Sequence, residues 1–209
     1  MKQGQKGSVK MVKKNNVGSE KWTYAEFEKF LQTFSDDSME KLAFEMLYWT
    51  GMRAGELIGL FLKDFDLNKG IVSISKSAYV ENGRTFFTGT KTISSHRVID
   101  IPQFLVNDIE SYLNILKCKN PEIQIFDTSV VKLSYLIQRH AERANIKKIR
   151  VHMFRKMHWD MLIEIGVPAV EREERLGKSV FLSYMEMEYK KTHECVRLLE
   201  EKYLSEKGH

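Results

Sequence analysis

Residues 70–101 read GIVSISKSAYVENGRTFFTGTKTISSHRVIDI, and this stretch interrupts a chain that is otherwise patterned for helices. Short runs of β-branched and aromatic residues, which favour strands, occur at 71–74, 86–87 and 98–101. Asn82 and Gly83 stand between two of these runs, as turn residues do in antiparallel hairpins. The stretch therefore predicts a small three-stranded antiparallel sheet.

Helical patterns lie on both sides of this stretch. Thr23 and Glu26 have the spacing of a capping box, which marks the start of a helix. Pro102 and Pro168 suit first helical turns, and Gly177 suits a helix end. Apolar residues at helical spacing predict helices over 23–34, 42–50, 102–116, 129–145, 152–166 and 168–177, and a C-terminal one through 204. The fold class that follows is α+β and mainly α-helical.

Composition bounds the class of protein. A chain of 209 residues with 43% hydrophobic residues can bury the core of one domain. Its 33 Lys and Arg exceed its 28 Asp and Glu, and this net charge of +5 favours a polyanionic partner. Cys118 and Cys195 lie in unrelated contexts, which argues against a disulfide framework. No apolar run approaches the roughly 20 residues that span a bilayer, so we expect a soluble, cytoplasmic protein without membrane contact.

The first 20 residues differ from the rest. Residues 1–20 hold five lysines and three glycines and almost no apolar side chains, so they cannot bury enough surface to fold. We expect a flexible basic leader before one domain at 21–209. A second interpretation is a basic linker that crosses a DNA backbone and follows an upstream domain absent from this chain.

The residues that can carry chemistry are scattered cations and a tyrosine. The sequence has no glycine-rich phosphate loop and no HExxH or metal-finger spacing, so no cofactor and no metal are expected. Arg53 in TGMRAGEL has a glycine on either side, and close packing there would hold its phosphate-binding fork rigidly. A surface salt bridge to Glu56 is the simpler interpretation of Arg53 alone.

Four other residues have a chemical and a structural interpretation. Lys91 in GTKTISSHRVIDIP, between two β-prone runs, can protonate a departing oxygen from a hairpin or remain a solvated turn lysine. His152 and Arg155 in VHMFRKMH are three apart, so one helix face presents both, as phosphate ligands or as a structural pair. Tyr189 in MEMEYKKTHE is a nucleophile only beside cations that stabilise the phenolate, and otherwise a core or interface residue.

The ordered set TGMRAGEL, TKTISSHRVIDIP, HMFR, ERLGKS and a tyrosine eleven positions after Lys178 resembles the tyrosine recombinase (phage integrase) family over about residues 21–195. The resemblance implies an integrase-type catalytic domain. It implies that Arg53 and Arg155 hold the scissile phosphate, that Lys91 protonates the leaving 5′ oxygen and that His152 assists proton transfer. The nucleophile that it implies is Tyr189.

The chain departs from the family pattern at two positions. Lys178 follows Leu-Gly where the family has His or Trp; it keeps a donor and a positive charge but lacks the imidazole suited to proton exchange. Lys156 stands where the family's HxLRH box has its second histidine. Tyr184 is a rival nucleophile, although its offset of six from Lys178 is short for the family.

The resemblance also implies a function and partners. The implied function is site-specific integration or excision of a phage or mobile element, without metal or ATP. The implied substrate is double-stranded DNA, and four subunits are expected to act together on it. Two alternatives stay open. One is a type IB topoisomerase, which uses similar chemistry without a specific pair of sites. The other is a decayed integrase that only binds DNA, which the substitutions at Lys156 and Lys178 favour.

Overall fold

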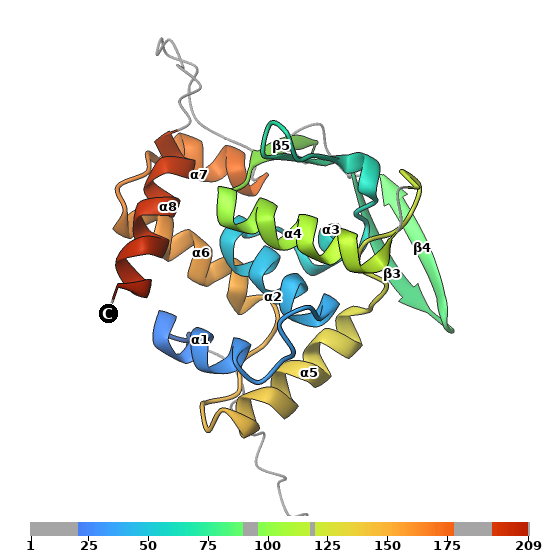
Figure 1. Cartoon of the computed structure of the whole chain (residues 1–209), viewed down its shortest axis with the longest axis horizontal. Coiled ribbons are helices and arrows are strands. Elements are labelled where there is room, and N and C mark those ends of the chain that lie inside the picture. Colours follow the sequence, from blue (N-terminus) through green and yellow to red (C-terminus); the bar gives the residue numbers. More distant parts are fainter. Residues whose placement is uncertain (1–20, 90–95, 118–119, 178–193, 209) are drawn as a thin grey trace, which may run out of the picture.

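The computed structural model describes residues 21–89, 96–117, 120–177 and 194–208. Its helices (Figure 1) are α1 Tyr24–Leu31, α2 Met39–Thr50, α3 Ala54–Ile58, α4 Gln103–Leu116, α5 Val130–Arg143, α6 Met153–Glu164, α7 Ala169–Leu176 and α8 Glu194–Lys207. Its strands are β1 Phe65–Asp66, β2 Ile71–Ile74, β3 Lys76–Glu81, β4 Arg84–Gly89 and β5 Arg97–Asp100, and the 3-10 helix η1 Leu62–Asp64 precedes β1. The predicted helices are confirmed.

Local sequence signals set the helix ends. Thr23 Oγ1 accepts a hydrogen bond from the Glu26 amide at 3.2 Å, and the Glu26 carboxylate accepts one from the Thr23 amide at 2.8 Å, which completes the predicted capping box. Helices α2 and α7 end at Gly51 and Gly177, whose φ angles of 65° and 59° lie in the left-handed region that glycine adopts at low cost.

The strands form two sheets. The three-stranded antiparallel sheet has the order β1-β2-β5, with Val72 opposite Ile99. Strands β3 and β4 form a separate hairpin, closed by Asn82 and Gly83, whose positive φ angles of 50° and 73° suit a two-residue turn.

The predicted three-stranded sheet therefore exists, but its members differ from the prediction. The run at 86–87 lies in β4 and pairs with β3, while the two residues of β1 supply the third strand. Apolar runs show that a segment suits a strand, whereas its partner depends on contacts distant in sequence. One such contact is α3, which lies against β3 so closely that a Cβ on Gly55 would stand 2.5 Å from Ser77 Oγ.

Helix α2 is the centre of the core. Eight of its twelve residues are buried, and it packs against α6 and α4 (Figure 1). Phe27 of α1 stacks on Tyr48 with ring centroids 4.0 Å apart, and Phe154 of α6 stacks on Phe44 at 5.5 Å. A helix that is apolar on nearly every side must be covered all round, so the first turn of α6 is held tightly against α2.

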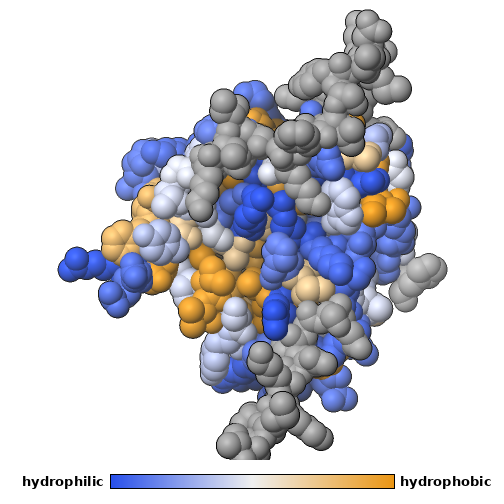
Figure 2. Space-filling view, turned by 180° about the vertical axis from the view of Figure 1, so that it is seen from behind, coloured by the Kyte–Doolittle hydropathy of each residue, from blue (hydrophilic) through white to orange (hydrophobic). Residues whose placement is uncertain are grey.

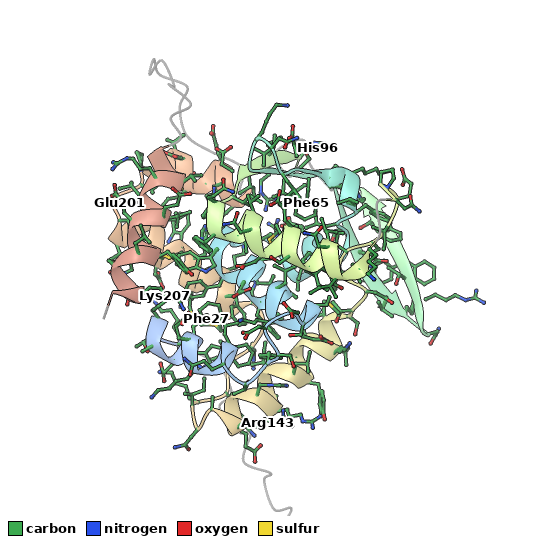
Figure 3. All side chains as sticks on the ribbon, viewed as in Figure 1. Phe27, Phe65, His96, Arg143, Glu201 and Lys207 are labelled. Atoms are coloured by element: carbon green, nitrogen blue, oxygen red, sulfur yellow. The ribbon has the colours of Figure 1, made fainter. Side chains whose placement is uncertain are left out.

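The C-terminal helix α8 closes one side of the domain. Its Leu199 is buried, and its Tyr203 stacks on Phe104 of α4 at 3.9 Å. Lys207 lies beside α1 in Figure 3 and pairs with Glu28 at 2.5 Å. These contacts tie the last helix to the first.

The surface mixes polar and apolar side chains. The face that Figure 2 shows carries strongly hydrophilic residues near its middle, with a hydrophobic patch beside them. Large exposed apolar residues include Val131 and Tyr135 of α5. None of the helices in the described ranges is both long and apolar enough to cross a bilayer.

The Gly51 turn joins α2, α6 and α7, and we expect it to be sensitive to substitution. A Cβ at Gly51 would lie 2.5 Å from His158 Cδ2 and 2.6 Å from Leu176 Cδ2. Gly51→Ala should cost about 1–2 kcal/mol of left-handed strain and about 1–3 kcal/mol of overpacking. Gly83→Ala is the control, because Gly83 has a similar φ and no atom within 4 Å of the added Cβ. Urea unfolding should show the larger loss for Gly51→Ala, and equal losses would contradict this packing.

Candidate active site

Two helix ends fix the guanidinium of Arg155. Its Nη1 donates to the Gly51 carbonyl at 2.8 Å, and its Nη2 donates to the Leu176 carbonyl. Both carbonyls lie at C-terminal helix ends, where the helix dipole is negative. Burial and the charge of Arg53 lower the pKa of Arg155 to about 10, so the group stays charged at neutral pH.

Arg53 caps α3 and reaches solvent. Its Nη1 donates to Glu56 Oε1 at 2.7 Å, and its backbone amide donates to Glu56 Oε2 at 2.7 Å. The Arg53 side chain is 46% exposed, whereas that of Glu56 is 2% exposed. The pair is therefore no surface salt bridge: a buried carboxylate holds an arginine whose outer face remains available to a ligand.

A second arginine completes the surroundings of Glu56. Arg97, the first residue of β5, donates from Nη1 to Glu56 Oε1 at 3.1 Å and from Nη2 to Glu56 Oε2 at 2.9 Å. Burial raises the pKa of Glu56, but the hydrogen bonding and charge of Arg97 and the two hydrogen bonds from Arg53 outweigh this effect, so the pKa lies below its usual value. Glu56 is thus an anion at neutral pH.

His152 stands at the start of α6, next to both exposed and buried cations. Burial lowers the pKa of its imidazole, and the charges of Arg155 and Arg53 lower it further. The three candidate residues Arg53, His152 and Arg155 are therefore within electrostatic reach of one another. A neutral imidazole beside two guanidinium groups can accept a proton while the guanidinium groups bind an anion.

Arg175 and His158 form a buried polar pair next to this cluster. Arg175 Nε donates to His158 Nε2 at 3.2 Å, and both side chains are buried. Burial and the charge of Arg175 hold the pKa of His158 well below its usual range. The pair joins α7 to α6 and supports the turn whose Leu176 carbonyl binds Arg155.

Three predicted site residues, Lys91, Lys178 and Tyr189, lie outside the described residues, as does the rival Tyr184. Two further residues of the cluster, Glu56 and Arg97, are not among the predicted site residues. The sequence pattern gives Glu56 only as the partner of Arg53 in a surface pair and does not single out Arg97. The apolar run AGELIGL around Glu56 is a partial signal: it is compatible with burial, and a buried carboxylate must be paired, but the run does not show that Glu56 is buried.

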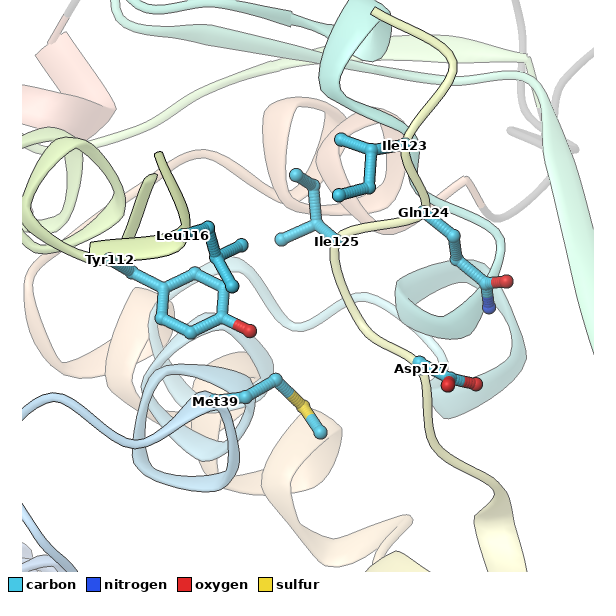
Figure 4. Close-up of a pocket in the computed structure, with 7 residues that line it drawn as sticks. All are labelled: Met39, Tyr112, Leu116, Ile123, Gln124, Ile125 and Asp127. Carbon is cyan, nitrogen blue, oxygen red and sulfur yellow. The ribbon is translucent and has the colours of Figure 1, made fainter. Parts of the chain in front are cut away.

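An open hollow of about 440 Å³ lies elsewhere, between the start of α2, the end of α4 and the segment before α5 (Figure 4). It is lined by Met39, Tyr112, Leu116, Ile123, Gln124, Ile125 and Asp127. Its one charged side chain is a carboxylate, so it suits a phosphate poorly. Within the described parts of the chain, no three His, Cys, Asp or Glu side chains are grouped to hold a metal ion.

The segments that carry the arginine cluster match a known protein family. The sequence profile of the Phage integrase family matches residues 21–180, most of the chain. This chain belongs to the phage integrase family. Arg53, His152 and Arg155 all lie within the matched region.

Relatives of this integrase-family chain include proteins named integrase and tyrosine recombinase. The ICEBs1 integrase of Bacillus subtilis (strain 168) is 28% identical over 170 residues, which cover 75% of this chain and 46% of that protein. Tyrosine recombinase XerA of Thermococcus kodakarensis is also 28% identical over 170 residues, with 78% and 55% covered. The chain thus spans about half the length of these relatives.

Solved structures confirm the predicted integrase-type fold. The Tn1549 transposon integrase in complex with circular intermediate DNA superimposes with a TM-score of 0.67 at 19% identity, covering 79% of this chain and 61% of that one. A crystal structure of XerA recombinase gives a TM-score of 0.62 at 18% identity, with 93% and 66% covered.

The electrostatic link between Arg53 and His152 can be measured. We expect the His152 imidazole to titrate below 6.5 in the free protein, and Arg53→Gln to raise its pKa by removing a positive neighbour. NMR titration of the histidine ring protons reports both values.

His140 provides the matched control, because burial and the charges of Arg143 and Arg139 lower its pKa at a separate place. Arg143→Gln should raise the pKa of His140 and leave that of His152 unchanged. Arg53→Gln should raise the pKa of His152 and leave that of His140 unchanged. If the pKa of His152 is unchanged in Arg53→Gln, the two residues do not interact electrostatically, and the cluster as described is contradicted.

Proposed function

We propose that this phage integrase family chain is the catalytic part of a site-specific recombinase, which cleaves and rejoins DNA through a 3′-phosphotyrosine intermediate. The observation that carries the proposal is the convergence of Arg53, His152 and Arg155. Arg155 binds the Gly51 carbonyl, two residues before Arg53, and the charges of both arginines lower the pKa of His152. These residues come from segments about a hundred positions apart, and separate structural roles would not require them to share one cationic surface.

The arginines provide the phosphate-binding part of the proposed site. Arg155 is fixed by two carbonyls and Arg53 by Glu56, so neither guanidinium must be reorganised when a phosphate arrives. Donors that are already in place stabilise the charge that develops on the non-bridging oxygens, which is commonly the largest contribution in such sites. Arg53 approaches from the solvent side and Arg155 from the protein side.

The proposed reaction is a transesterification. The Tyr189 phenol oxygen forms a bond to phosphorus while the bond from phosphorus to the 5′ oxygen breaks. The phenol proton passes to His152, whose lowered pKa keeps it neutral and able to accept. Lys91 donates a proton to the departing 5′ oxygen, and Lys178 is a supporting donor. The protein–DNA ester keeps the energy of the broken bond, so a 5′ hydroxyl of another strand can displace the tyrosine without ATP.

The proposed substrate is double-stranded DNA at the ends of a phage or mobile element, acted on by four subunits in the cytoplasm. The DNA bound to the Tn1549 integrase and the net charge of +5 support this choice. Residues 21–209 form the proposed catalytic domain, and residues 1–20 form a basic segment before it.

Covalent trapping tests the proposal. Nicked duplexes tiled across the DNA that flanks the gene should yield a covalent protein–DNA adduct, because loss of the short strand beyond the cleavage point prevents religation. Tyr189→Phe should abolish the adduct, and Tyr184→Phe, the control, should retain it. Denaturing gels with labelled DNA measure both, and plasmid relaxation is followed in parallel.

Three other outcomes would contradict parts of the proposal. An adduct that persists in Tyr189→Phe contradicts the assignment of the nucleophile. Relaxation of plasmids that lack the flanking sequence indicates a type IB topoisomerase. Salt-dependent binding without any adduct indicates a protein that only binds DNA.

A further inference from the structure

Arg97 lies beside the candidate site and makes several hydrogen bonds to its supports. It is 6% exposed, and three of its nitrogen atoms donate hydrogen bonds to two different elements. Nη1 and Nη2 bind the Glu56 carboxylate of α3, and Nε donates to the Arg175 carbonyl of α7 at 2.8 Å. All three guanidinium nitrogens of Arg97 donate to protein acceptors, so we expect its effect on the site to pass through these partners.

The packing around Arg97 leaves little room for movement. Gly177 ends α7 with a φ of 59°, and a Cβ there would lie 2.8 Å from Arg97 Nη1. The guanidinium plane thus lies against the glycine turn on one side and the Glu56 carboxylate on another. A lysine ammonium has no planar fork and cannot satisfy both partners with the same geometry.

Both partners of Arg97 hold a phosphate-binding arginine. Glu56 also binds the side chain and the amide of Arg53. The Arg175 carbonyl is followed directly by that of Leu176, which binds Arg155. One buried guanidinium therefore links the supports of two arginines that lie on different elements.

We propose that Arg97 is a positioning residue for strand cleavage: by holding Glu56 and the end of α7 together, it sets the separation of the Arg53 and Arg155 guanidinium groups. This inference rests on the proposed function. An error of about 1 Å in such a placement can reduce a rate about 100-fold without removing any group that contacts the substrate.

The test is single-turnover cleavage by Arg97→Lys at saturating concentrations of the nicked duplex. We expect cleavage to be about 10- to 100-fold slower per folded molecule, with a DNA dissociation constant within about twofold of wild type because charge is conserved and the side chain is buried. Lys41→Gln is the control, because it breaks the Lys41–Asp36 ion pair near the start of α2, whereas Arg155 binds the carbonyl at the other end of that helix. The control should cleave at the wild-type rate per folded molecule.

A methylphosphonate at the scissile position separates positioning from general structural damage. This group lacks one negative oxygen, so alignment of both guanidinium groups matters less, and the defect of Arg97→Lys relative to wild type should shrink. A merely structural role would give the same defect on both substrates and would overturn the proposal.

If Arg97→Lys does not fold, a glycine pair tests the same claim. Gly177→Ala displaces the Arg97 guanidinium, whereas Gly166→Ala imposes similar left-handed strain, at a φ of 83°, with no atom within 4 Å. The proposal is supported if cleavage is slow in Gly177→Ala but not in Gly166→Ala. It is contradicted if the two variants cleave at equal rates. Absence of any wild-type adduct would instead defeat the proposed function, whereas wild-type rates in Arg97→Lys would defeat this inference alone.

Discussion

The organisation of the candidate site depends on one buried anion, the carboxylate of Glu56. It accepts hydrogen bonds from the Arg53 amide, the Arg53 side chain and two nitrogen atoms of Arg97. A carboxylate so buried is strongly unfavourable unless it is paired and hydrogen-bonded, and breaking such a pair leaves an uncompensated charge. Its partners are therefore as constrained as the carboxylate itself, and they come from α3 and β5.

The same anion makes a cationic cluster tolerable in the absence of DNA. Burial, together with repulsion from Arg53 and Arg97, lowers the pKa of Arg155. Glu56 offsets part of the repulsion, and the helix-end carbonyls at Gly51 and Leu176 offset more. A phosphate bound by Arg53 and Arg155 would offset the remaining repulsion between them, so the cluster favours an anionic ligand.

The sequence was sufficient where the signals are local. Capping residues, prolines and glycines predicted the helix positions, because each acts within one or two turns of the chain. It is insufficient where partners are distant in sequence: the run at 86–87 suits a strand, but nothing in the run shows that this strand, β4, pairs with β3. The arginines were recognised through motifs, whereas burial of Glu56 depends on β5 and α7 closing over α3. The spacing of Arg53 and Glu56 looks identical in a surface pair and in a buried one.

The pH dependence of unfolding tests the central role of the Glu56 charge most directly. Because the folded pKa of Glu56 lies below its usual 4.5, its stabilisation is present above that value and is lost as the pH falls through the folded pKa. Glu56→Gln should unfold with about 3–5 kcal/mol less free energy than wild type at pH 7. That difference should narrow below pH 4.5 as wild-type Glu56 takes up its proton. A difference near zero at pH 7, or one that stays constant as the pH falls, would contradict the account.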